Sequence, residues 1–287
     1  MAMRETKTHY RTCCICEAMC GITIEHRDGK VLSIKPDKDD VFSQGHICPK
    51  AVALKDIHED PDRLRQPMRR TPKGWEEVSW DSAFEEIEGR IGGIRKTHGN
   101  DAVAVYLGNP TVHNLGATLN VGNFIRALKT QNLYSATSVD QLPHMVAAWA
   151  MFGHQFLMPV PDVDRTQLFV CIGGNPLVSG GSLMGAPGFE KRIKALHARG
   201  GKFIVIDPRR TENAALADKH FFIRPGSDVY MLLAMLNVVF DEGLQTLGSA
   251  DGFTRGLEQI REMVAAFTPE TASEFTAVRA DDIRTLV

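Results

Sequence analysis

Residues 13–20 have the sequence Cys-Cys-Ile-Cys-Glu-Ala-Met-Cys, and the segment Cys-Pro-Lys follows at residues 48–50. These two segments hold five of the six cysteines of the chain, and the sixth is Cys171. A reduced cytosolic protein has little use for such a group of thiols as disulfides, so metal ligation is the better interpretation. The cysteine pattern is therefore the strongest indication of fold and function in this sequence.

The spacing of the cysteines indicates which kind of metal site to expect. Three thiolates come from one tight loop and a fourth from a distant segment: Cys13, Cys16, Cys20 and Cys48. A cubane iron–sulfur cluster needs four sulfur ligands that converge from different directions, and this pattern suits it. A structural zinc site is the alternative, but such sites usually show two Cys-x2-Cys pairs, which Cys20 and Cys48 lack. Cys14 is expected to be a small buried residue and not a fifth ligand.

A small β-rich lobe is predicted around these cysteines. Residues 21–36 form two strand-like runs joined at Asp28-Gly29, a dipeptide typical of tight hairpins. We therefore expect residues 1–62 to form an iron–sulfur domain. The polar stretch 58–74, with three prolines, is predicted to be a connector that runs over the surface.

Residues 63–287 show the pattern of an α/β domain. One helix is predicted behind Ser79 or Asp81 and another over residues 189–199. Apolar, strand-like runs alternate with helical segments and cover residues 102–107, 168–172, 203–206 and 221–223. Such runs indicate a parallel sheet covered on both faces. The predicted fold class is α/β, with the small β-rich lobe first and a parallel-sheet domain after it.

Composition excludes several classes of protein. With 287 residues, 43% of them apolar and 24% charged, the chain is typical of a globular protein. Its 33 basic and 35 acidic residues give a net charge of −2, so nucleic acid is not an expected partner. No apolar run approaches the roughly 20 residues of a membrane span, and the start lacks the apolar run of a secretory signal. We expect a cytoplasmic protein with no membrane span.

The cysteine motif followed by Pro49 and Lys50 resembles the N-terminus of the bis(molybdopterin guanine dinucleotide) oxidoreductases. This is the dimethyl sulfoxide reductase superfamily, with formate dehydrogenases and nitrate reductases among its members. Further pieces follow in the order of that family, at residues 74–75, 78–83, 173–176, 207–211, 217–218 and 224–228. The resemblance implies a [4Fe–4S] cluster, a molybdenum cofactor with two such dinucleotides, a small-molecule substrate and a redox partner protein.

Members of this superfamily are more than twice as long, and their C-terminal β-barrel completes the cofactor site. The helix predicted at residues 280–287 stops after fewer than two turns, with no closing Gly or Pro. We therefore expect the α/β domain to be cut at its C-terminus, or the chain to be a split subunit.

The resemblance also assigns residues to the cofactor. Lys50 would lie between the cluster and one pterin, where a cation stabilises the negative charge that arrives on either centre. Nucleotide and pyrophosphate would bind at strand ends, where glycines let backbone N–H groups approach phosphate. Asp207 could accept hydrogen bonds from guanine or ribose, and Arg209 or Arg210 could bind phosphate. Ordinary strand-to-helix turns are the alternative for each isolated motif. The residues expected at the cofactor are Lys50, Asn109, Gly174, Asn175, Pro176, Asp207, Pro208, Arg209, Thr211, Pro225, Gly226, Ser227 and Asp228.

The molybdenum ligand would come from the loop at residues 132–143. Matching this loop to the family pattern places Asp140 at the ligand position, with Ser138 as the nearest rival. A carboxylate is a hard oxygen donor, which suits an oxidised molybdenum centre. The alternative is that Asp140 caps the helix that starts near Pro143. Gln141 stands where formate dehydrogenases have His, which argues against formate oxidation.

Two main functions follow from these residues. The first is a molybdenum oxidoreductase with Asp140 and Lys50 as catalytic residues, in which a two-electron substrate reaction at molybdenum is coupled to single-electron relay by the cluster. The alternative is an iron–sulfur electron-transfer subunit of the same fold without molybdenum, and a zinc-stabilised binding domain is a third. His113 and His144 either line the molybdenum site or are ordinary polar residues.

Overall fold

The computed structural model describes residues 5–181 and 185–287, which divide into two compact units. The first unit takes in the described residues up to Pro161 and those between Ser179 and Gly188. The second unit consists of Asp162–Val178 and Phe189–Val287. The first unit thus extends well past residue 62, where the sequence suggests a domain boundary; that boundary stays a prediction.

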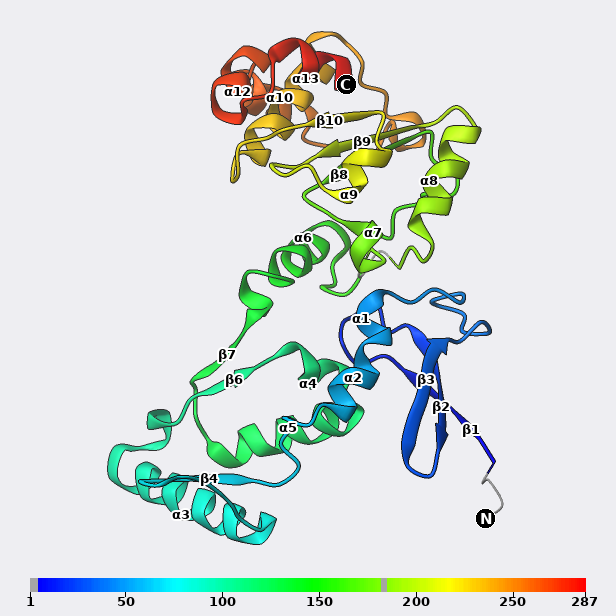
Figure 1. Ribbon diagram of the computed structural model, residues 1–287. Helices are drawn as coiled ribbons and strands as arrows, with labels where there is room; N and C mark the ends of the chain where they lie inside the picture. Colours follow the sequence, from blue (N-terminus) through cyan, green and yellow to red (C-terminus); the bar gives the residue numbers. More distant parts are fainter. Residues whose placement is uncertain (1–4, 182–184) are drawn as a thin grey trace. The chain divides into compact units, whose positions relative to one another are not determined.

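The first unit is built from short strands and helices (Figure 1). Its strands are β1 (Lys7–Thr12), β2 (Gly21–Arg27), β3 (Lys30–Pro36), β4 (Met68–Thr71), β5 (Gly74–Glu77), β6 (Val105–Leu107) and β7 (Leu133–Ser135). Its helices are α1 (Pro49–Val52), α2 (Leu54–Glu59), α3 (Trp80–His98), α4 (Asn109–His113), α5 (Leu115–Leu128) and α6 (Leu142–Phe152). Two 3-10 turns are η1 (Asn100–Ala102) and η2 (Ala136–Ser138).

The second unit alternates strands with helices. Its strands are β8 (Leu168–Ile172), β9 (Lys202–Ile206) and β10 (Lys219–Phe221). Its helical segments are α7 (Pro176–Ser179), α8 (Phe189–Ala198), α9 (Glu212–Leu216), α10 (Asp228–Asp241), η4 (Gly248–Ala250), α11 (Leu257–Val264), α12 (Pro269–Thr276) and α13 (Ala280–Leu286). Within the described parts of both units, none of the helices combines the length and the apolar character needed to cross a bilayer.

An antiparallel sheet of β1, β2 and β3 opens the chain. Asp28 and Gly29 turn the chain between β2 and β3 with φ angles of 51° and 78°, as a tight hairpin requires. The hairpin predicted at this dipeptide is confirmed. Cys13, Ile22 and Ala51 are buried in a small core of this lobe, so the cysteine loop and α1 pack together.

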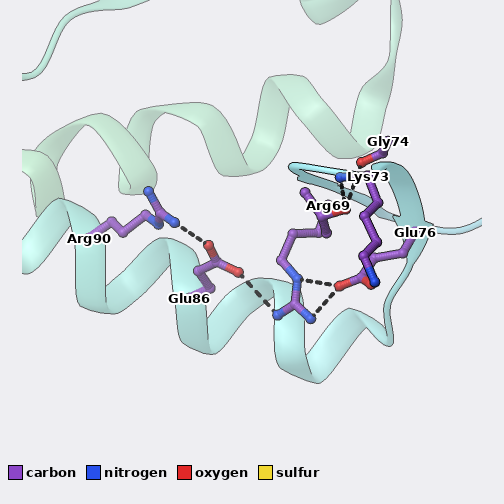
Figure 2. A network of polar contacts seen from close by, with 7 residues as sticks. Arg69, Lys73, Gly74, Glu76, Glu86 and Arg90 are labelled. Carbon is purple, nitrogen blue, oxygen red and sulfur yellow. Dashed lines mark hydrogen bonds and ion pairs between the residues drawn. The ribbon is translucent and has the colours of Figure 1, made fainter.

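Residues 58–74, expected to be a surface connector, contain the strand β4. It pairs with β5 in an antiparallel hairpin, and Arg69 donates hydrogen bonds of 2.7 and 2.9 Å to Glu76 across the two strands. Arg69 also lies 3.6 Å from Glu86 of α3, which pairs with Arg90 (Figure 2). The connector prediction is wrong for Met68–Thr71, because its backbone pairs with β5 although the sequence Met-Arg-Arg-Thr shows no apolar alternation.

The strand predicted over residues 102–107 is shorter than expected and has a separate partner. β6 pairs in parallel with β7, with Val105 opposite Leu133, and the two form a sheet of their own. The expectation that this strand joins the later ones in one sheet is wrong. β7 has only three residues, too few for a recognisable pattern in the sequence. Since the pair is parallel, the residues that follow β6 and β7 lie at the same edge.

β8, β9 and β10 form a parallel sheet in the order β10-β9-β8. Alternate side chains of β9 point to opposite faces. Phe203 faces α8, where its ring centroid lies 5.7 Å from that of Phe189. Ile204 and Ile206 lie in a core with residues of α10, α12 and α13 on the other face (Figure 1). The prediction of a parallel sheet covered on both faces is confirmed for this unit.

The short helix α13 packs firmly into the core of the second unit. Ile283 is fully buried there. Asp282 accepts hydrogen bonds of 2.7 Å from Lys219 and 2.8 Å from Arg279. Helices of this length are not stable alone, so these tertiary contacts hold α13 in place.

We expect Asp282→Asn to lower the free energy of unfolding of the second unit by about 1–2 kcal/mol at pH 7. Hydrogen bonds from Arg279 and Lys219 lower the pKa of Asp282 from 3.8 to about 2, and its side chain is 15% exposed. Because the folded-state pKa lies below the unfolded one, this stabilisation is present above about pH 4 and is lost as the pH falls towards 2. Urea unfolding at both pH values measures it. Asp281→Asn, at an exposed neighbour, is the control, and an equal loss in the two variants would contradict the expectation.

Candidate functional site

The cysteine loop that follows β1 is closed by its own backbone. The N–H of Cys13 donates to the carbonyl oxygen of Cys20 at 2.8 Å, and the N–H of Met19 donates to that of Cys16 at 3.2 Å. Met19 has a left-handed φ of 43°, which completes the turn. Three of the predicted ligand thiols therefore come from one compact loop. Cys14 is half-buried in this loop and not buried as expected.

A second contact ties this loop to the segment that leads to Cys48. The N–H of Gly21, directly after Cys20, donates to the hydroxyl of Ser43 at 3.1 Å, and that hydroxyl donates to Asp40 at 2.6 Å. A Cβ atom at Gly21 would lie 2.5 Å from that of Asp40, so only glycine fits at this close approach. Hydrogen bonds from the side chain and N–H of Ser43 lower the pKa of Asp40, which keeps this carboxylate charged.

Cys48 is the N-cap residue of α1, and its carbonyl oxygen accepts the N–H of Ala51 at 3.1 Å. Ala51 is buried beside Cys13 in the core of the lobe. This packing brings the fourth cysteine towards the loop that holds the other three. Lys50 lies one residue before Ala51 and is exposed.

The four predicted ligand thiols are close enough to affect one another. Burial raises the pKa of Cys20 to about 11, and the neighbouring Cys13, Cys16 and Cys48 add to the rise. Burial likewise raises the pKa of Cys13. Thiolates crowded in this way repel one another, and the iron ions of a cluster would compensate their charge. The donor set therefore fits a [4Fe–4S] cluster.

A single metal ion and a cubane cluster require different distances between their sulfur ligands. A zinc ion draws its sulfur ligands to within about 4 Å of one another, since each Zn–S bond is about 2.3 Å long. A cubane cluster arranges its four thiolates around four iron atoms and spaces them more widely. Over residues 5–181 and 185–287, no group of three or more His, Cys, Asp or Glu side chains is placed to hold one metal ion.

Asp140 and the cysteine loop border the same cavity in the first unit. This cavity has a volume of about 510 Å³ and lies where the chain leaves β6 and β7. Glu17, between Cys16 and Cys20, contributes one part of its lining, and Asp140 and Gln141 contribute another. Two segments that are about 120 residues apart in the sequence therefore meet at one space.

The start of α6 bears on the alternative in which Asp140 caps this helix. The N-cap residue of this helix is Gln141, whose side chain makes no capping hydrogen bond. Asp140 is therefore not the N-cap residue of α6, although the capping alternative expected it in that position. Ser138 is exposed in η2, before Asp140. Of the two predicted histidines, His113 lines the cavity and His144 is exposed on α6.

The loops after β8 and β9 meet at one edge of the sheet in the second unit, as neighbouring parallel strands predict. The side-chain amide of Asn175 donates to Glu212 at 2.8 Å. Asn213 donates to the side-chain oxygen of Asn175 at 2.6 Å and to the carbonyl oxygen of Gly174 at 3.2 Å. The hydrogen bond from Asn175 lowers the pKa of Glu212. Segment 173–176 is thus joined to the start of α9.

Glu212 and Asn213 were not predicted as site residues. In the sequence they look like ordinary polar residues of a helix start, and nothing there shows that Asn213 is buried. The one available signal is that both residues directly follow Thr211, the last residue of the segment 207–211 that comes after a predicted strand.

Asp207 and Thr211 lie buried between β9 and α9. The carboxylate of Asp207 accepts the N–H of Arg209 at 2.7 Å, which shapes the turn. Thr211 is 5% exposed, and among the described residues its hydroxyl oxygen has no hydrogen-bond partner. A buried hydroxyl without a partner is costly and marks a place where a ligand or water binds. This oxygen fits a polar ligand at the strand end, as a nucleotide would be.

The third predicted segment, 224–228, is a tight turn before α10. The hydroxyl of Ser227 donates to the carbonyl oxygen of Arg224 at 2.6 Å, and Gly226 has a φ of 77° that the turn requires. The remaining predicted positions are placed as follows: Pro176 is buried at the start of α7, Pro208 and Pro225 are exposed, and Asp228 begins α10. Asn109 begins α4, and its side chain lies outside the described part of the chain.

Comparisons with known proteins agree with this arrangement. Residues 63–268 match the family model described as molybdopterin oxidoreductase, and residues 3–59 match that of its Fe4S4 domain. The chain is 28% identical over 268 residues to the F420-dependent formate dehydrogenase subunit alpha of Methanocaldococcus jannaschii, covering 93% of this chain and 38% of that protein. It is also 28% identical over 275 residues to the molybdopterin-containing subunit of thiosulfate reductase from Salmonella typhimurium, with 94% and 35% covered.

Among solved structures, the chain is similar to acetylene hydratase from Pelobacter acetylenicus. The TM-score is 0.77 with 25% sequence identity, over 96% of this chain and 38% of that one. The chain thus spans less than two fifths of the length of these three proteins, whose names refer to three different reactions. The resemblance to the dimethyl sulfoxide reductase superfamily is confirmed. Since the first family model alone covers more than two thirds of its residues, the chain belongs to the molybdopterin oxidoreductase family.

Proposed function

We propose that this chain forms the cofactor-binding, N-terminal part of a molybdenum oxidoreductase. In this enzyme a two-electron reaction of a small substrate would be coupled to an iron–sulfur electron relay. The observation that supports the proposal most strongly is the cavity lined by both Asp140 and Glu17. Two redox centres held by Asp140 and by the cysteine loop would be neighbours, as a relay requires.

The cysteine loop and α1 would hold the cluster in this proposal. Its ligands would be Cys13, Cys16, Cys20 and Cys48. The hydrogen bond between Gly21 and Ser43 joins the loop to the segment before Cys48, which supports the proposal that the four thiols bind one cluster. Lys50, two residues after Cys48, would place a positive charge near the cluster and ease the arrival of an electron.

Asp140 would supply a protein ligand to the molybdenum. When bound, the molybdenum cofactor supplies the transfer of two electrons to or from the substrate. Asp140 and its neighbour Gln141 both line the cavity. Gln141 is neutral and cannot donate a proton at neutral pH as a histidine can, so formate is not the substrate that we propose. Asp140 and Lys50 remain our proposed catalytic residues.

The strand ends of the second unit would bind the guanine dinucleotide ends of the cofactor. The hydroxyl of Thr211 has hydrogen-bonding capacity left for a ligand. Asp207 could accept hydrogen bonds from guanine or ribose, while Arg209, exposed beside it, could bind phosphate. The backbone of residues 173–176 and the turn at 225–228 would approach the pyrophosphate.

A redox partner protein and a cytoplasmic location complete the proposal. The cluster must exchange electrons with an external donor or acceptor if the substrate reaction is to turn over, and we propose a redox protein in that role. All six cysteines are free, which suits a reducing compartment. The net charge of −2 gives no reason to expect nucleic acid.

Metal analysis of the protein, expressed with all segments that its gene encodes in a host that makes the molybdenum cofactor, tests this proposal. We expect about four iron atoms per chain, together with molybdenum. Iron without molybdenum would favour the electron-transfer subunit instead, and zinc without iron would favour a zinc-stabilised binding domain. Anaerobic purification and elemental analysis by mass spectrometry give the result.

A further inference from the structure

Asn213 is a polar side chain that is fully buried at the edge of the second-unit sheet. Its amide nitrogen donates to the carbonyl oxygen of Gly174 at 3.2 Å and to the side-chain oxygen of Asn175 at 2.6 Å. Its side-chain oxygen accepts the N–H of Leu177 at 3.4 Å. A single residue of α9 therefore contacts two positions of the loop after β8, Gly174 and Asn175, and one residue of α7, Leu177.

The same loop is also held from the side of β8. The thiol of Cys171 donates to the carbonyl oxygen of Gly174 at 3.4 Å. A Cβ atom at Gly174 would lie 3.1 Å from that sulfur, which is closer than most Cβ contacts in proteins. Glycine therefore suits this position beside Cys171. The carbonyl oxygen of Gly174 thus lies between donors from β8 and from α9.

Asn175 completes the connection. Its side-chain oxygen accepts from Asn213, and its amide nitrogen donates to Glu212 at 2.8 Å. Both ends of this side chain are therefore bound by two consecutive residues of α9. The loop begins with Gly173, which has a φ of 64°, and two consecutive glycines give it great conformational freedom unless other contacts restrict it.

We infer that Asn213 is a positioning residue that fixes the loop at residues 173–176 in the shape that binds the guanine nucleotide end of the cofactor. The inference rests on the proposed function of these strand ends. Asn213 would not touch the nucleotide. It would act through Gly174 and Asn175, because a loop held in one conformation before binding loses less entropy when the ligand arrives.

A purely structural role for Asn213 gives a different expectation. Removing a buried amide leaves its partners unsatisfied and lowers stability in either case. A positioning role makes a further prediction: Asn213→Ala should weaken nucleotide binding when Asn175 is present, and should weaken it much less when Asn175 has already been replaced. The matched control is Asn237 of α10, whose amide donates to the carbonyl oxygen of Val264 at 3.2 Å, within the same unit but in contact with α11.

The test is the affinity of the full chain for guanosine diphosphate, measured by isothermal titration calorimetry, with thermal unfolding measured in parallel. The variants are Asn213→Ala, Asn175→Ala, the double variant and Asn237→Ala. We expect Asn213→Ala to raise the dissociation constant about tenfold and Asn237→Ala to leave it within about twofold, although both lower the melting temperature. In the Asn175→Ala background, Asn213→Ala should add less than about threefold, because the two residues act as one connection.

Each result has one meaning. If the unmodified chain does not bind guanosine diphosphate, the proposed nucleotide site is wrong, and the inference falls with it. If it binds and Asn213→Ala binds equally well, the inference alone is wrong. Equal and additive losses in the Asn175 and Asn213 variants would likewise overturn it. Should Asn213→Ala fail to fold, Asn213→Ser, which keeps one donor, takes its place and is expected to show a smaller loss.

Discussion

A protein in which Cys48 is replaced by Ala is expected to lose nearly all of its iron and its brown absorption. A cubane cluster needs four thiolates, and three of the proposed ligands come from one loop while Cys48 alone comes from the N-cap position of α1. Loss of the distant ligand leaves one corner of the cluster without a protein ligand and open to solvent. Iron and acid-labile sulfide, measured after anaerobic reconstitution, should fall from about four atoms of each per chain to near zero.

The other cysteines provide the controls for this experiment. Cys14→Ala changes a residue of the same loop that is not a proposed ligand, and Cys171→Ala changes a buried thiol in the second unit. Both variants should keep the full iron content. Normal iron and sulfide in the Cys48→Ala protein would show that the cluster has a different fourth ligand.

Asp140→Ala is expected to reduce substrate turnover of the molybdenum-loaded protein by at least about a hundredfold while leaving its iron content unchanged. Loss of residues that merely orient metal ligands already costs about 10-fold to 100-fold, and loss of a direct ligand should cost more. Asp140 lines the cavity and is not the N-cap residue of α6, so removal of its carboxylate should leave the helix intact. Turnover with an artificial electron donor or acceptor, molybdenum content and iron content are measured on the same preparation.

Ser138→Ala is the matched control, since Ser138 is the rival ligand in the same stretch of chain and is exposed. We expect this variant to keep its activity. Full activity in Asp140→Ala together with loss of activity in Ser138→Ala would reverse the assignment. Loss of iron in Asp140→Ala would instead point to a general disturbance of the first unit.

The sequence predicts those parts of the fold that depend on local pattern. The Asp28-Gly29 hairpin follows from backbone preference, and the strands of the second unit follow from continuous apolar runs. Their parallel arrangement in turn predicts that the loops after β8 and β9 meet. Charge pairing between Arg69 and Glu76 leaves no such pattern, which is why β4 was expected to be part of a connector.

Other features depend on which segments become neighbours in space. β7 exists only because it lies beside β6, and its three residues carry no signal of their own. Asn213 is buried because the loop after β8 packs against it. The sequence of α9 alone does not predict this contact. The shared cavity of Glu17 and Asp140 is of the same kind, because it arises from two segments that are distant in the sequence. Residue types could suggest the ligands, but only the tertiary structure shows which of them border a common space.

The small core of the cysteine lobe has a consequence for how the protein matures in a cell. Among the described residues, its fully buried members are Cys13, a proposed ligand, Ile22 and Ala51, and the side chains packed against them are only partly buried, whereas the sheet of the second unit is covered on both faces. A lobe with so few fully buried side chains is marginal by itself, and metal binding supplies folding free energy in domains of this kind. In iron-starved cells, the second unit of a newly made chain would therefore fold, while its N-terminal cysteine lobe would stay partly unfolded. Proteases act on such segments first, so the abundance of the protein would follow the iron supply through degradation, without any dedicated sensor.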